Sequence, residues 1–132
     1  MTSILVVDDE PLIAMALEAV LEDAGYQVMM AANGRQGLER LAETRADVVL
    51  LDMMMPVMNG PAMLAAMAAE PSLAEIPVII LSSLPEEVVR IRAQGSAMIL
   101  RKPYTAHEVL DAIARVLGEA REAGGDPGSP TP

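Results

Sequence analysis

The chain has 132 residues, of which 52% are hydrophobic and 21% charged, a composition that excludes disorder for its body and fits one domain with one core. Nineteen acidic against nine basic residues leave a net charge of −10, which disfavours nucleic acid and anionic lipid as direct partners and favours cations or basic surfaces. The absence of cysteine excludes disulfides, thiolate nucleophiles and thiolate metal sites.

The first half of the chain alternates apolar runs with helical patterns. Residues 3–7 (SILVV) form a continuous apolar run, which is typical of a strand buried on both faces. From Pro11 the apolar residues recur at helical spacing, and Gly25 is the predicted end of this helix. The same alternation predicts a strand at 26–31, a helix at 35–42, a strand at 47–51 and a helix at 61–69.

The second half repeats this alternation, with a strand at 77–81, a short helix at 85–93, a strand at 97–100 and a longer helix from 105 to about 121. Thr105 and Glu108 have the spacing of a capping box at the start of the last helix, and Ser83 and Glu86 have the same spacing before the short one. Five strand-helix units predict an α/β fold, in which helices cover both faces of a doubly wound, five-stranded parallel sheet in three α/β/α layers.

The domain boundary follows from composition. We assign residues 1–121 to the domain and residues 122–132, which are rich in Gly and Pro, to a disordered tail without an output domain. No apolar run approaches the ~20 residues of a membrane span, and the start of the chain resembles a strand rather than a basic leader. We therefore expect a cytoplasmic protein with no membrane contact.

Polar side chains follow the predicted strands, at the edge where doubly wound sheets bind ligands. The candidates for one shared site are Asp8, Asp9, Asp52, Ser82 and Lys102. Two carboxylates about 4 Å apart repel by about 4 kcal/mol at an effective dielectric of about 20, so this cluster requires a cation. Oxygen ligands without His or Cys favour Mg²⁺, for which Mn²⁺ can substitute. Together with a Lys ammonium and a hydroxyl, these groups suit phosphoryl transfer to a carboxylate.

These residues occur in four recognisable motifs, which are Val7-Asp8-Asp9-Glu10, Asp52-x-x-Met55-Pro56-x-x-Asn59-Gly60, Ser82 and Lys102-Pro103. Over about residues 3–120 the chain resembles the receiver domain of bacterial two-component response regulators. The resemblance implies a stand-alone, CheY-like receiver with the flavodoxin-like strand order 2-1-3-4-5. It also implies a switch domain that phosphorylates and dephosphorylates itself, rather than a turnover enzyme.

The resemblance implies a role for each site residue. Asp52 would accept a phosphoryl group from a histidine kinase or a histidine phosphotransfer protein. Asp9 and Asp52 would bind Mg²⁺ directly, Asp8 through water, and Met54 through its backbone carbonyl. Ser82 and Lys102 would contact the phosphoryl oxygens.

The resemblance has two further implications, one for the Lys102-Pro103 peptide bond and one for the surface that binds partners. The Lys102-Pro103 peptide bond would be cis. The output would be binding to a downstream protein through the face of the fourth helix, fifth strand and fifth helix, which a homodimer or a kinase contact can also use.

Three features depart from the family pattern. Ile99 stands where receivers usually carry the aromatic partner of the switch residue Ser82. Only about nine residues remain for the fourth helix, which is therefore expected to be short or mobile. The side chains two positions after Asp52 and Ser82 are the apolar Met54 and Leu84, which cannot position an attacking water. We therefore expect an atypical switch with slow spontaneous hydrolysis.

Two other function classes stay open. A pseudo-receiver would keep the fold and bind partners without phosphorylation. Ile99 and the short fourth helix favour this class, whereas the intact acidic set and Lys102 oppose it. A small phosphatase with an aspartate nucleophile ranks last, because such enzymes carry Asp-x-Asp on one strand. Six of the eleven methionines lie between residues 53 and 67 and are interpreted as core filling rather than a soft-metal site.

Overall fold

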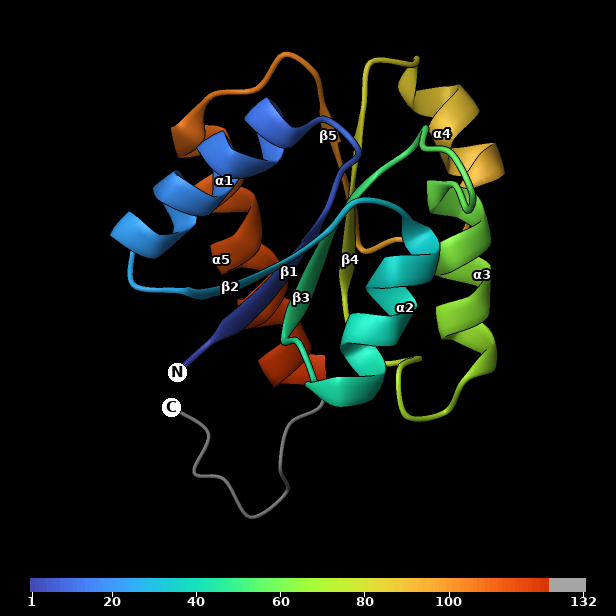
Figure 1. The fold of residues 1–132 in the computed structure, drawn as a ribbon, viewed down its shortest axis with the longest axis horizontal. Coiled ribbons are helices and arrows are strands. Elements are labelled where there is room, and N and C mark those ends of the chain that lie inside the picture. Colours follow the sequence, from blue (N-terminus) through green and yellow to red (C-terminus); the bar gives the residue numbers. More distant parts are fainter. Residues whose placement is uncertain (124–132) are drawn as a thin grey trace.

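Strands and helices alternate throughout the computed structural model, which describes residues 1–123 (Figure 1). The strands are β1 (Ser3–Val7), β2 (Gln27–Ala31), β3 (Val48–Asp52), β4 (Val78–Ser82) and β5 (Met98–Arg101). The helices are α1 (Pro11–Asp23), α2 (Gly34–Glu43), α3 (Gly60–Ala69), α4 (Glu86–Arg92) and α5 (Ala106–Ala123). The predicted α/β alternation is confirmed, with boundaries that shift by one or two residues.

The strands form one parallel sheet in the order β2-β1-β3-β4-β5. The strand order expected from the resemblance is therefore confirmed. After β2 the chain crosses back over β1 and continues outward through β3, so the direction of winding reverses between β1 and β3. Ligands of doubly wound sheets bind at such a reversal, beyond the carboxyl ends of the strands. The end of β1 and the end of β3 therefore lie side by side at the expected site.

The core has two layers, one on each face of the sheet. Successive residues of a strand point to opposite faces, so Leu5 and Val7 of β1 join one layer and Ile4 and Val6 join the other. The first layer packs under α2, α3 and α4, and the second under α1 and α5, as Figure 1 shows. Strands β1, β3 and β4 are buried along their whole length, which explains their continuous apolar sequences.

The cluster of methionines fills part of this core. Met53, Met63 and Met67 are buried, and Met55 and Met58 pack against the same layer. Met54 is the exception within the cluster, because 68% of its surface is exposed. Core filling therefore explains the other five residues and leaves Met54 without a packing role.

The start of α4 differs from the prediction. Ser83 and Glu86 do not form a capping box, because Pro85 occupies the N-cap position and makes no side-chain cap bond. The helix therefore begins at Glu86, two residues later than a box with Ser83 as its N-cap requires. The hydroxyl of Ser82 instead accepts a hydrogen bond from the Leu84 N–H at 3.0 Å. With seven residues, α4 is short, as expected.

The capping box of α5 is confirmed. The Thr105 N–H donates to Glu108 Oε1 at 3.0 Å, and the Glu108 N–H donates to Thr105 Oγ1 at 3.1 Å. The helix includes the first two residues of the predicted tail, and residues 124–132 lie outside the described residues. Within residues 1–123, no helix combines the length and apolar character that crossing a bilayer demands.

Candidate functional site

Three carboxylates meet where β1 and β3 end. Asp8, Asp9 and Asp52 each offer an oxygen within 4.8 Å of the others. Asp52 is the last residue of β3, and Asp8 and Asp9 follow β1, so the parallel pairing of these strands brings the three together. Asp8 and Asp52 are buried, whereas Asp9 is exposed and forms the open side of the cluster.

The Asp8 carboxylate has one satisfied and one free oxygen. Its Oδ1 accepts a hydrogen bond from the Glu10 N–H at 2.9 Å, which fixes the carboxylate over the start of α1. Its Oδ2 is buried, and no group among the described residues donates to it. A buried carboxylate oxygen without a donor is costly, so this atom is a ready ligand for a cation.

Burial sets the electrostatics of the cluster. It raises the pKa of Asp8 and of Asp52 above the usual carboxylate range, and the neighbouring carboxylates raise both further. The charge of Lys102 lowers both pKa values, as does the Glu10 N–H for Asp8 and the Lys102 hydrogen bond for Asp52. Burial is the largest effect, so the charged cluster lacks sufficient positive charge on its own.

Lys102 reaches the cluster from the end of β5. Its Nζ donates to Asp52 Oδ1 at 3.1 Å, and both side chains are largely buried. Its backbone N–H donates to the Ser82 carbonyl at 2.9 Å, and its peptide bond to Pro103 is cis. Neighbouring Arg101, by contrast, is exposed, as expected for a surface charge.

The structure places Ser82 at the end of β4, next in the sheet to Asp52. The residue is buried, and its hydroxyl accepts the Leu84 N–H while keeping its own hydrogen for donation. Ser83 is exposed and contributes nothing to the carboxylate cluster. Of the polar residues that follow the strands, the fold thus gathers Asp8, Asp9, Asp52, Ser82 and Lys102 at one edge.

The segment after Asp52 is held tightly. The Gly60 N–H donates to the Met53 carbonyl at 3.0 Å, and a Cβ at Gly60 would lie 2.5 Å from the Asp52 carbonyl oxygen. Only Gly therefore fits at the start of α3. Val57, within the same loop, has φ 67, a left-handed conformation that is rare for a β-branched residue.

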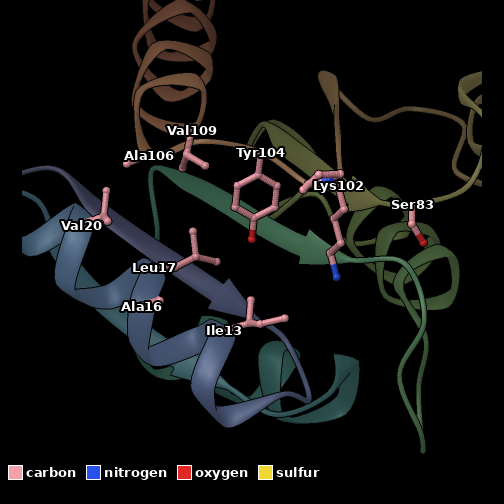
Figure 2. Close-up of a pocket in the computed structure, with 10 residues that line it drawn as sticks. Ile13, Ala16, Leu17, Val20, Ser83, Lys102, Tyr104, Ala106 and Val109 are labelled. Atoms are coloured by element: carbon pink, nitrogen blue, oxygen red, sulfur yellow. The ribbon is translucent and has the colours of Figure 1, made fainter.

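An apolar cavity of about 510 Å³ lies beside the cluster, between α1 and α5 (Figure 2). Ile13, Leu17 and Val109 line it together with Tyr104 and Lys102. The Tyr104 hydroxyl and the Lys102 ammonium reach toward the same side of this cavity, above the start of α1. Burial, followed by the charges of Asp8, Asp52 and Glu10, raises the pKa of Tyr104 to about 12.

The residues present fit a hard divalent cation. Three carboxylates supply oxygen ligands on one open side, and the buried Asp8 Oδ2 has no other partner among residues 1–123. Nitrogen and sulfur ligands are absent from the cluster, which favours Mg²⁺ over zinc or copper.

Comparison with known proteins decides the family. Residues 4–114 match the model of the response regulator receiver domain. The chain belongs to the response regulator receiver family. The resemblance noted from the sequence motifs is therefore confirmed, and so is a role in two-component signalling.

Three relatives illustrate this membership. Protein PilH of Pseudomonas aeruginosa is 35% identical over 119 residues, which cover 89% of this chain and 98% of PilH. Chemotaxis protein CheY4 of Vibrio cholerae has a TM-score of 0.83 at 31% identity, over 88% of this chain and 98% of CheY4. The receiver domain of the Pseudomonas aeruginosa sensor histidine kinase PA1611 has a TM-score of 0.82 at 28% identity, over 89% of this chain and 98% of that one. That structure contains a magnesium ion coordinated in its active site cleft.

Other relatives are longer proteins. The chain covers 12%, 57% and 49% of the length of three of them, so it corresponds to one domain of each. In PilH and CheY4, by contrast, the receiver domain makes up almost the whole matched chain.

Ile99 of this receiver lies on β5, half-buried against the core layer under α4. It lines a cavity of about 310 Å³ together with Arg90, Ser96 and Met98. The position therefore faces the gap between α4 and β5, where a larger side chain has room to move.

Two residues near the receiver site escaped the sequence analysis. Tyr104 follows Lys102 by two positions, and its position after β5 is the signal that could have indicated it. Gly60 appeared only as the last residue of the Asp52 motif, and its structural role was missed because its contact with the Asp52 carbonyl depends on how the loop folds back.

Proposed function

We propose that Asp52 accepts a phosphoryl group from the phosphohistidine of a histidine kinase or a histidine phosphotransfer protein in a Mg²⁺-dependent reaction. The observation that carries this proposal is the position of Asp52 between Lys102 and two further carboxylates. This arrangement supplies a nucleophile, a fixed positive charge and ligands for a second charge at one point.

The transfer forms a bond between an Asp52 carboxylate oxygen and phosphorus and breaks the phosphorus–nitrogen bond of the phosphohistidine, whose imidazole keeps the electron pair. Burial of Asp52 leaves its carboxylate poorly solvated, which favours attack. Lys102 already donates to Asp52 Oδ1, so its ammonium is within reach of the equatorial phosphoryl oxygens. Asp8, Asp9, Asp52 and the Met54 carbonyl would hold Mg²⁺, which neutralises phosphoryl charge when bound.

Ser82 would couple the site to the rest of the domain. Its hydroxyl hydrogen would be donated to a phosphoryl oxygen, and its bond to the Leu84 N–H would carry the shift into the segment before α4. The output would be a change in protein binding on the face of α4, β5 and α5, where Ile91 is exposed. With Ile at position 99, this switch would work without an aromatic ring.

A pseudo-receiver is the second candidate function, and the exchange of an aromatic residue for Ile99 is the observation that favours it. The carboxylate cluster and the Lys102–Asp52 contact weigh against it, because a binding module without phosphorylation has no use for an unneutralised buried carboxylate.

The test is phosphorylation by acetyl phosphate or phosphoramidate with and without Mg²⁺, followed by intact mass. We expect a Mg²⁺-dependent, base-labile phosphoryl group on the wild type and on Asp23→Asn, an exposed aspartate of α1. Asp52→Asn should remain unmodified. A wild type that stays unmodified under every condition would contradict the proposal and favour the pseudo-receiver.

A further inference from the structure

The proposed phosphoryl transfer leaves the apolar cavity between α1 and α5 without a role. Its volume of about 510 Å³ falls within the roughly 300–1,000 Å³ of pockets that bind small molecules. Helix α1 supplies one wall through Ile13, Leu17 and Val20, and α5 supplies another through Val109 (Figure 2). These walls can remove the apolar surface of a ligand from water, which is the main source of affinity in such a site.

Besides the exposed Ser83, two polar groups reach this cavity, the Lys102 ammonium and the Tyr104 hydroxyl. The ammonium is already engaged, since Lys102 Nζ donates to Asp52 Oδ1 at 3.1 Å. No side-chain hydrogen bond within residues 1–123 engages the Tyr104 hydroxyl. Because the pKa of Tyr104 is raised to about 12, this hydroxyl keeps its proton at neutral pH. A ligand in the cavity therefore meets one free hydrogen-bond donor.

Charge at this end of the molecule restricts the kind of ligand. Asp8, Asp52 and Glu10 all raise the pKa of Tyr104, so their negative potential extends to its hydroxyl. A carboxylate or phosphate group at that point would meet the same repulsion. A cationic ligand is disfavoured by the apolar walls and by the Lys102 ammonium. A neutral molecule with a hydrogen-bond acceptor on an apolar body suits both the walls and the hydroxyl.

We propose that the cavity between α1 and α5 binds a neutral, largely apolar small molecule whose carbonyl oxygen accepts a hydrogen bond from the Tyr104 hydroxyl. The apolar body of this ligand lies against Ile13, Leu17 and Val109. Binding requires neither Mg²⁺ nor a phosphoryl group on Asp52. The cavity thus gives this receiver a second input, which is separate from the phosphodonor.

The probe for this site is prodan, a neutral naphthalene that carries one ketone and one dimethylamino group and whose emission shifts when it leaves water. The chain has no Trp, so no indole emission overlaps with the measurement. Protein is titrated into a fixed low concentration of prodan without Mg²⁺. The matched control probe is dimethylaminonaphthalene, which has the same ring and amine but no ketone.

Three variants decide where and how the probe binds. Tyr104→Phe keeps the aromatic ring and removes the donor. Ala16→Leu fills part of the cavity from α1, whereas Ala19→Leu makes the same exchange at an exposed position of that helix outside the cavity lining. Urea unfolding checks that each variant is folded.

We expect prodan to bind the wild type and Ala19→Leu with the same affinity. Tyr104→Phe should bind prodan about fivefold more weakly, which is the effect of one hydrogen bond. The same variant should bind the probe without a ketone as well as the wild type does. Ala16→Leu should weaken the binding of both probes by about tenfold or more, because its side chain takes up space in the cavity.

Prodan emission that does not change at protein concentrations up to about 1 mM overturns the inference. Equal affinity of the wild type and Ala16→Leu also overturns it, because the probe then binds elsewhere on the surface. If Tyr104→Phe weakens both probes equally, the hydrogen bond to the ketone is refuted. A protein dimer that excludes the probe, detected by sedimentation velocity, would assign the cavity to a second copy of the chain instead.

Discussion

The Nζ of Lys102 donates a hydrogen bond to Asp52 Oδ1 at 3.1 Å, although fifty residues separate the two in the chain. This contact joins the end of β5 to the end of β3 across β4. It is the only positive charge within hydrogen-bond distance of Asp52 among the described residues. The balance of charge at the site therefore depends on one side chain.

Lys102→Met should destabilise the protein at neutral pH by about 1–3 kcal/mol, because it leaves the buried Asp52 carboxylate without its donor. The pKa of Asp52 should rise further, since Lys102 lowers it. Urea unfolding measures the stability change. Arg101→Met, at the exposed neighbouring position, should change stability by less than about 0.5 kcal/mol. Equal losses in both variants would contradict the importance of the contact.

Asp8→Asn should stabilise the protein at neutral pH when divalent ions are absent. Burial raises the pKa of Asp8 in the folded state, so folding favours its protonated form. The favourable contribution is complete below the unfolded pKa and is lost as pH rises through the higher folded pKa. Asn removes the charge and still accepts the Glu10 N–H. Urea unfolding at neutral and acidic pH should show a gain that shrinks on acidification, and a less stable variant at neutral pH would refute the argument.

Gly60→Ala should destabilise the protein by about 1–3 kcal/mol, because its Cβ would meet the Asp52 carbonyl oxygen at 2.5 Å. The matched control is Gly118→Ala in α5, where a Cβ meets no atom of the described residues within 4 Å. That exchange should stabilise the helix by about 1 kcal/mol. Thermal or urea unfolding gives both values. A Gly60→Ala variant that is as stable as the wild type, or more stable, would show that the contact is relieved at little cost.

Val57→Gly should stabilise the protein by about 1 kcal/mol. Val57 has φ 67, which is strained for a β-branched side chain, and 75% of it is exposed, so little packing is lost. Val88→Gly, within the ordinary helical backbone of α4, should be destabilising by about 1 kcal/mol or more. A loss of stability in both variants, measured by urea unfolding, would contradict the assignment of strain to Val57.

Tyr104 should ionise near pH 12 rather than at the ordinary value of 10.0. Its contribution to stability is complete below about pH 10 and is lost as pH rises toward 12, because the unfolded chain ionises first. A rapid pH titration of tyrosinate absorbance in Tyr26→Phe isolates this residue. Asp52→Asn in that background should lower the pKa of Tyr104, since the charge of Asp52 raises it. An unchanged pKa of Tyr104 would contradict an electrostatic effect of the Asp52 charge on this residue.

Local patterns in the sequence determined the alternation of strands and helices. The strands at Ser3–Val7 and Val48–Asp52 are recognisable because burial on both faces requires a continuous apolar run. The same patterns placed polar residues just after the strands, and parallel strands bring such residues to one edge. The residues of the candidate site could therefore be predicted from the sequence. The capping box at the start of α5 could be predicted as well.

Tertiary structure alone decided how these groups meet. The contact between Lys102 and Asp52 and the approach of Gly60 to the Asp52 carbonyl join residues that lie apart along the chain. The lack of a donor for Asp8 Oδ2 among the described residues likewise depends on how the elements around it pack. The start of α4 was misplaced because Pro85, rather than Ser83, took the cap. The exposure of Met54, in a methionine cluster that is otherwise packed, could not be predicted from the sequence either. Sequence patterns carry the periodicity of single elements, whereas these features depend on the packing of several elements together.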